Sequence, residues 1–109
     1  MSRHTLEKLT RKLTYFSDAG HGWLGVKRET LKILGIEDQI GGYSYETTSG
    51  RTVYLEEDRD MVIFLHALAE SLKMGKVEFS AWLASRIHHS ASTRSHIRSK
   101  PHYRHVSAS

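Results

Sequence analysis

The sequence predicts a small α+β domain, in which a helix packs on an antiparallel sheet built from two hairpins. Three observations predict this class. The chain has 109 residues, which suits one domain with one hydrophobic core. Two pairs of strand-like segments are each joined by a short link that contains glycine. One long segment near the middle has the hydrophobic spacing of an amphipathic helix.

The chain starts with a short helix and the first hairpin. In TLEKLTRKL, leucines spaced three and four residues apart predict an amphipathic helix. LTYFS at 13–17 and WLGVK at 23–27 predict two strands, joined by a turn of hairpin composition. In this turn we expect Asp18 to form an Asx turn. We expect Gly20 and Gly22 to supply positive φ.

A second short helix and a second hairpin follow. RETLKILG at 28–35 predicts two helical turns, and its final Gly35 is a typical helix C-terminus. YSYE at 43–46 and TVYLEE at 52–57 predict two strands around the turn sequence TTSG. The two hairpins could together form one four-stranded sheet, with elements in the order β-β-α-β-β-α after the first helix.

The segment DRDMVIFLHALAESLKMG predicts the main helix, at 60–74, covering one face of the sheet. Its buried stripe is expected to comprise Met61, Phe64, Leu65, Leu68 and Leu72. Asp58 or Asp60 is expected to cap the helix, and Gly75 to end it. EFSAWLASRI at 78–87 predicts one more short helix.

Acidic and basic residues are distributed unevenly along the chain. Residues 1–78 hold 11 lysines and arginines against 12 acids, whereas residues 79–109 hold five bases and no acid. From residue 89 the sequence is rich in serine, histidine and arginine, and it has few residues that could join a core. The sequence therefore predicts a single α+β domain at 1–88 and a flexible, disordered basic tail at 89–109.

Composition also excludes some classes of function. The chain has no cysteine, so disulfides and thiolate metal sites are impossible. No apolar run approaches the roughly 20 residues that span a bilayer, and the first residues lack the apolar core of a signal peptide. We expect a cytoplasmic protein of a bacterial host cell, with no cofactor and no bound metal. Its oligomeric state stays open.

Four ordered blocks resemble a known family. They are DAGHGWLGV at 18–26, LGI at 34–36, YSY at 43–45 and VYLEEDRD at 53–60. Together they span roughly residues 15–68, and the pattern is similar to that of small uncharacterised proteins carried by bacteriophages, prophages and plasmids. The resemblance implies a mobile-element accessory protein, and we expect it to have no enzymatic activity. Such a protein would bind and block a host protein or complex, for example a component of CRISPR or restriction defence.

Candidate contact residues gather in three of these blocks. Each also has a structural explanation: a hairpin tip for the histidine, cross-strand packing for the tyrosines, and the helix dipole for the acids. The alternative is a protein-binding surface, because tyrosines and exposed charges suit interfaces. The expected partner-binding residues are His21, Tyr43, Tyr45, Glu56, Glu57 and Asp58.

Two alternative functions stay open. The basic tail could track nucleic-acid phosphates, which would make the protein a nucleic-acid-binding accessory protein. The residues expected to do so are Arg94, Arg98, Lys100 and Arg104. The less favoured alternative is a metal-dependent hydrolase, which requires His21 and either Glu56 or Asp58 to meet in one cleft.

Overall fold

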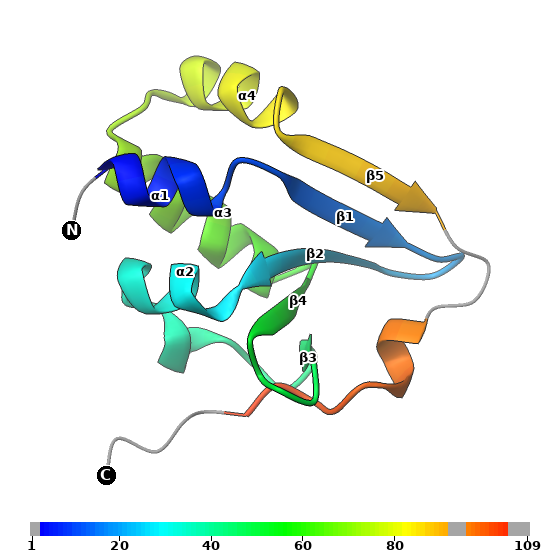
Figure 1. Ribbon diagram of the computed structural model, residues 1–109. Coiled ribbons are helices and arrows are strands. Elements are labelled where there is room, and N and C mark those ends of the chain that lie inside the picture. The colour runs from blue at the N-terminus through cyan, green and yellow to red at the C-terminus, as the bar shows by residue number, and fades with distance from the viewer. Residues whose placement is uncertain (1–2, 92–95, 105–109) are drawn as a thin grey trace, which may run out of the picture.

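The computed structural model describes residues 3–91 and 96–104 (Figure 1). Within these residues the chain forms four α-helices, five β-strands and two 3-10 helices, so the α+β class is confirmed. In chain order the elements are α1 (Arg3–Leu9), β1 (Leu13–Ser17), β2 (Gly22–Lys27), α2 (Arg28–Leu34), η1 (Glu37–Gln39), β3 (Tyr45–Glu46), β4 (Thr52–Glu56), α3 (Asp60–Leu72), α4 (Lys76–Ala84), β5 (Ile87–Ala91) and η2 (His96–Ser99).

The strands form one sheet in the order β3-β4-β2-β1-β5. Both predicted hairpins are present, since β1 pairs with β2 and β3 with β4, each antiparallel. An antiparallel β2–β4 pair joins the hairpins, with Leu24 opposite Leu55. The sheet is nevertheless mixed, because β5 pairs in parallel with β1. An all-hairpin sheet was therefore the wrong expectation, and Ile87, expected on the last helix, lies on a strand.

The C-terminal segment also differs from the flexible tail that composition predicted. Ile97 and Tyr103 are only 2% and 6% exposed. The Glu46 N–H donates to the Pro101 carbonyl at 2.9 Å, and the Tyr103 N–H donates to the Ser44 carbonyl at 2.8 Å. Two things thus hold the segment: backbone hydrogen bonds to β3 and the residue before it, and the burial of two apolar side chains. These two side chains are six positions apart in the sequence, so they form no periodic hydrophobic pattern that would predict a helix or a strand. The remainder of the expected tail, residues 92–95 and 105–109, lies outside the described part of the chain.

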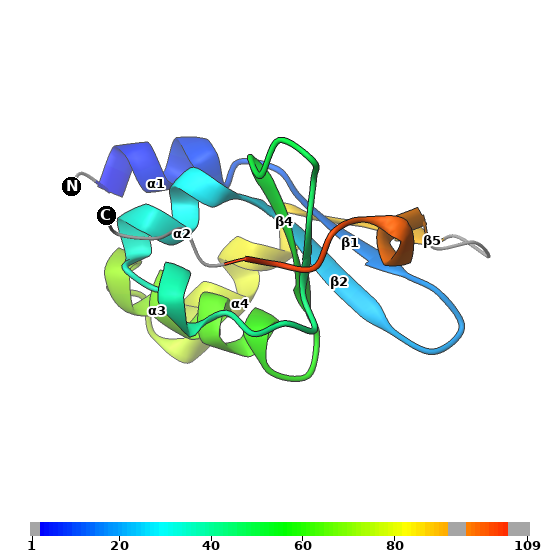
Figure 2. The ribbon, with the colours of Figure 1, turned by 90° about the horizontal axis from the view of Figure 1, so that it is seen from below.

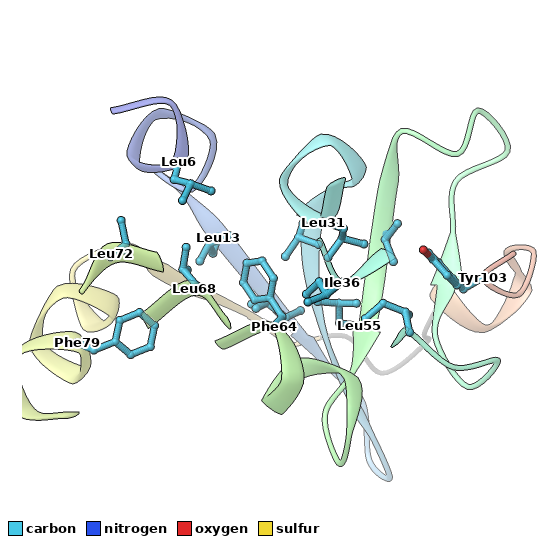
Figure 3. Close-up of a cluster of buried hydrophobic side chains, with 14 residues drawn as sticks. Leu6, Leu13, Leu31, Ile36, Leu55, Phe64, Leu68, Leu72, Phe79 and Tyr103 are labelled. Carbon is cyan, nitrogen blue, oxygen red and sulfur yellow. The ribbon is translucent and has the colours of Figure 1, made fainter. Parts of the chain in front are cut away.

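One hydrophobic cluster joins all four helices to one face of the sheet. In α3 the residues Phe64, Leu68 and Leu72 are fully buried, as the stripe predicted. Met61 and Leu65 pack at its margin. Figure 3 labels Leu6, Leu13, Leu31, Ile36, Leu55, Phe64, Leu68, Leu72, Phe79 and Tyr103 in this cluster.

Helix ends follow the expected pattern only in part. Gly35 ends α2 with φ 71°, in the left-handed region that favours glycine. At the end of α3, however, Lys73 has φ 56°, and Gly75 instead precedes α4. Neither Asp58 nor Asp60 caps α3. The Asp60 side chain turns away from the helix start and accepts hydrogen bonds from Gly41 and Ser44, so tertiary contacts replace the local cap.

The opposite face of the sheet carries aromatic side chains. Successive side chains of a strand point to opposite faces of the sheet. Leu24 and Leu55 point into the core, so the neighbouring Trp23 and Tyr54 point to the other face. We call Phe16, Trp23, Tyr45 and Tyr54 the aromatic face. Figure 2 shows the C-terminal segment, orange to red, crossing in front of the strands. There the Arg98 guanidinium lies over the Trp23 ring and the Lys100 ammonium over the Tyr54 ring.

Candidate functional site

A pocket of about 520 Å³ opens at one end of the aromatic face. Its walls come from the first hairpin, β3 with the residues before it, the end of β4 with the following turn, and η2. The pocket is lined by His21, Trp23, Tyr43, Tyr45, Glu56, Asp58, Arg59 and Arg98. Five of the six expected partner-binding residues therefore line one pocket, although they come from three separate stretches of sequence.

The first hairpin turn holds His21 at the rim. Asp18 Oδ1 accepts hydrogen bonds from the backbone N–H groups of Gly20 and His21, each at 3.0 Å. The expected Asx turn is thus present. The Gly20 hydrogen bond, with help from the Arg98 guanidinium, lowers the pKa of Asp18 below its usual value. His21 is exposed, and its ring centroid lies 6.0 Å from that of Trp23.

Gly22 is needed for space and not for backbone conformation. Among the described glycines only Gly35 and Gly50 have positive φ, so the expectation for Gly20 and Gly22 was wrong. A Cβ added to Gly22 would lie 1.8 Å from Tyr15 Oη. The Tyr15 ring therefore fills the volume that any larger residue would need. This contact links two strands, and a turn motif does not reveal it.

Aromatic rings form the inner wall of the pocket. Trp23 is 3% exposed, and its ring meets that of Tyr45 edge-on with centroids 6.2 Å apart. Tyr45 pairs with Tyr54 across the β3–β4 ladder, as the sequence predicted. The strand starts only at Tyr45, so Tyr43 precedes it and is 83% exposed at the rim. Stiff, amphipathic rings in this arrangement suit contact with another molecule.

The acids at 56–58 do not share one direction: β4 ends at Glu56, and Glu57 and Asp58 lie on the turn that follows. The Glu56 carboxylate accepts the backbone N–H groups of Asp58 at 2.9 Å and Arg59 at 3.1 Å. Asp58 is exposed at the pocket rim. Glu57 points elsewhere and accepts a hydrogen bond from Tyr15 Oη at 2.5 Å. Burial, followed by this hydrogen bond, raises the pKa of Tyr15 to about 12.

Both arginines of the pocket are already paired with carboxylates outside its lining. Arg98 Nε lies 3.1 Å from Asp18 Oδ2. Arg59 Nη1 lies 2.8 Å from Oδ1 of the buried Asp60. Arg98, which was expected to bind nucleic acid, lies over the Trp23 ring and pairs with Asp18 of the first hairpin, and its nucleic-acid contact stays a prediction. Sequence reasoning missed Trp23, Arg59 and Arg98 as pocket residues, because their assembly depends on contacts between distant segments.

The other expected nucleic-acid contacts also lie against the domain where the structure describes them. Arg94 falls outside the described residues. The Lys100 ammonium lies 5.6 Å from the Tyr54 ring centroid. Arg104 Nη2 lies 3.7 Å from Glu46 Oε2, and the side chain is 74% exposed. Only part of this cationic surface therefore faces solvent, and nucleic-acid binding stays a prediction.

His21, Glu56 and Asp58 line the same pocket, which the hydrolase alternative requires, but among the described residues no hydrogen bond joins His21 to either acid. Across residues 3–91 and 96–104, no three histidines or acids are grouped to hold a metal ion. That alternative also stays a prediction. In the same part of the chain, no helix has the length and apolar character required to cross a bilayer.

Comparison with known proteins adds no relative: no family model, curated protein or solved structure matches the chain.

Proposed function

We propose that the protein is a mobile-element accessory protein that binds a protein of the bacterial host and blocks it by covering its surface. The region around the pocket makes the contact. The resemblance of residues 15–68 to proteins of bacteriophages, prophages and plasmids supplies the setting. In that setting the proposed target belongs to a host defence system, such as CRISPR or restriction.

The observation that carries the proposal is that three aromatic side chains and one exposed carboxylate, unpaired within the described residues, line the same pocket. Trp23, Tyr43 and Tyr45 line it together with Asp58. Tryptophan, tyrosine and arginine dominate the residues that contribute most to protein–protein affinity. Tyr43 is 83% exposed and would lose most of its contact with water in a complex. The sheet holds the Trp23 and Tyr45 rings against each other before binding, which lowers the entropic cost of association.

The test is affinity capture from bacterial lysate with the full chain, followed by mass spectrometry. We compare the wild type with Tyr43→Ala, which removes the exposed ring. Val77→Ala, at an 85% exposed position of α4 outside the pocket lining, is the matched control. We expect a stoichiometric partner that the wild type and Val77→Ala retain and Tyr43→Ala loses. The proposal fails if no partner is captured, or if all three proteins capture it equally.

A further inference from the structure

We infer that the pocket receives an arginine side chain of the partner protein. This inference rests on the proposed function, because it names the chemical group through which that partner is recognised. Three features of the pocket carry it: charge, ring geometry and size.

The pocket lining holds two acids and two arginines, so its effective charge depends on how the arginines are paired. Within the described residues, its two arginines pair with Asp18 and Asp60. The Glu56 and Asp58 carboxylates are therefore left uncompensated. Asp58 is exposed, and no side-chain hydrogen bond or ion pair to its carboxylate is found in the described part of the chain. A cationic guest can pair with the exposed Asp58 carboxylate, which no side chain of the described residues neutralises.

The aromatic wall selects among cations. A guanidinium is planar and weakly hydrated, so it stacks on aromatic faces more readily than an ammonium group does. It can also donate two parallel hydrogen bonds to one carboxylate, which an ammonium cannot match in geometry. Tyr43 and Asp58, both exposed, offer the two kinds of contact at one opening. The His102 ring, by contrast, already lies against Tyr45, with centroids 4.8 Å apart.

The chain itself shows this mode of recognition next to the pocket. The Arg98 guanidinium centre lies 5.5 Å from the Trp23 ring centroid. The same group donates to both Asp18 carboxylate oxygens, at 3.1 Å and 3.5 Å. An aromatic ring and an aspartate thus already hold one arginine on this face. We expect an incoming arginine to use Asp58 and the exposed Tyr43 ring in the same way.

Size is consistent with a side chain and its adjoining backbone. Pockets that bind small ligands have volumes of roughly 300–1,000 Å³. The volume of about 520 Å³ is in the lower half of this range. A pocket of this volume can hold one long side chain with its flanking peptide groups.

The test is a nuclear magnetic resonance titration of the ¹⁵N-labelled full chain. The probes are N-acetyl-arginine-N-methylamide and its lysine counterpart. We expect the arginine probe to bind with a Kd of roughly 1 mM, as its size permits. It should shift the amide signals of His21, Tyr45 and Asp58. The lysine probe should bind at least threefold more weakly.

Asp58→Asn should weaken arginine binding at least fivefold. Glu70→Gln, which removes an exposed acid from α3, is the charge-matched control and should leave binding unchanged. An unchanged amide spectrum outside the pocket verifies that Asp58→Asn is folded. The inference is overturned if both probes bind equally, if the shifts fall outside the pocket, or if Asp58→Asn binds like the wild type.

The two proposals can fail separately. A partner that is captured through Tyr43 but is not displaced by the arginine probe would overturn the arginine inference alone. Failure to capture any partner would overturn the proposed function, whatever the probe does.

Discussion

The substitution Gly22→Ala tests the packing of the first hairpin. The new Cβ would lie 1.8 Å from Tyr15 Oη, 2.3 Å from Tyr15 Cζ and 3.0 Å from Glu57 Oε2. Real Cβ atoms essentially never approach another heavy atom within 3.0 Å, so the Tyr15 ring must move. Because the φ of Gly22 is not positive, the backbone itself can accommodate alanine.

The expected cost has two parts. Forcing extra volume into a packed site costs about 1–3 kcal/mol. Moving Tyr15 also breaks its hydrogen bond to Glu57, and at this half-buried position that loss is about 1 kcal/mol. The free energy of unfolding should therefore fall by about 3 kcal/mol. For a domain of this size, the Tm should fall by roughly 15 °C.

Urea denaturation followed by circular dichroism measures the change. Gly20→Ala is the matched control, because its added Cβ would lie 3.8 Å from the nearest atom, which is an ordinary contact. It should alter stability by less than about 0.5 kcal/mol. In a Tyr15→Ala background, Gly22→Ala should cost less than about 1 kcal/mol. Equal costs for both glycines, or an unchanged cost in that background, would refute the reasoning.

Three further predictions follow from buried polar groups and from the C-terminal segment. Asp60→Ala should lower the free energy of unfolding by about 3 kcal/mol in urea, because Asp60 is 2% exposed and bonded to Ser44. The control Asp58→Ala should lower the free energy of unfolding by less than about 0.5 kcal/mol. Similar losses for the two substitutions would contradict the structural role given to the Asp60 hydrogen bonds. In a chain that ends at residue 91, the free energy of unfolding should fall by about 3 kcal/mol, because the buried side chains of Ile97 and Tyr103 are removed. Removal of residues 105–109 alone is the control and should leave these two side chains in place. No loss on the longer truncation would restore the flexible-tail view. Burial raises the pKa of both Tyr15 and Tyr103 from 10.0 to about 12, so folding favours their neutral forms. The contribution of these two pKa shifts to the free energy of unfolding should be fully present below pH 10.0 and should decline between pH 10.0 and about 12. Urea denaturation of Tyr15→Phe across this pH range should show a smaller decline than the wild type.

Local patterns were sufficient to predict much of the fold. The 3.6-residue spacing of Phe64, Leu68 and Leu72 places them in the core because helix periodicity depends only on neighbouring residues. The two hairpins are similarly local, because each joins two strands that are consecutive in the sequence. The same patterns indicated most of the residues that line the pocket, although not that they would meet there.

Contacts between distant segments were not predictable from one sequence. β5 pairs with β1 in a register that places His89 opposite Tyr15, and its sequence IHHSA has little strand character of its own. Arg98 reaches Asp18 across 80 positions of the chain. Gly22 is required by a tyrosine on the neighbouring strand. These interactions arise only when the sheet assembles, so composition alone misassigned the C-terminal segment.

The most direct test of the central claim is hydrogen–deuterium exchange of the protein alone and in complex with its captured partner. If the pocket is the contact surface, the complex should protect amides at 20–24, 43–46 and 56–59. The groove between α3 and α4, which includes His66 and Phe79, should exchange as in the free protein. Protection at that groove with none at the pocket would contradict the account.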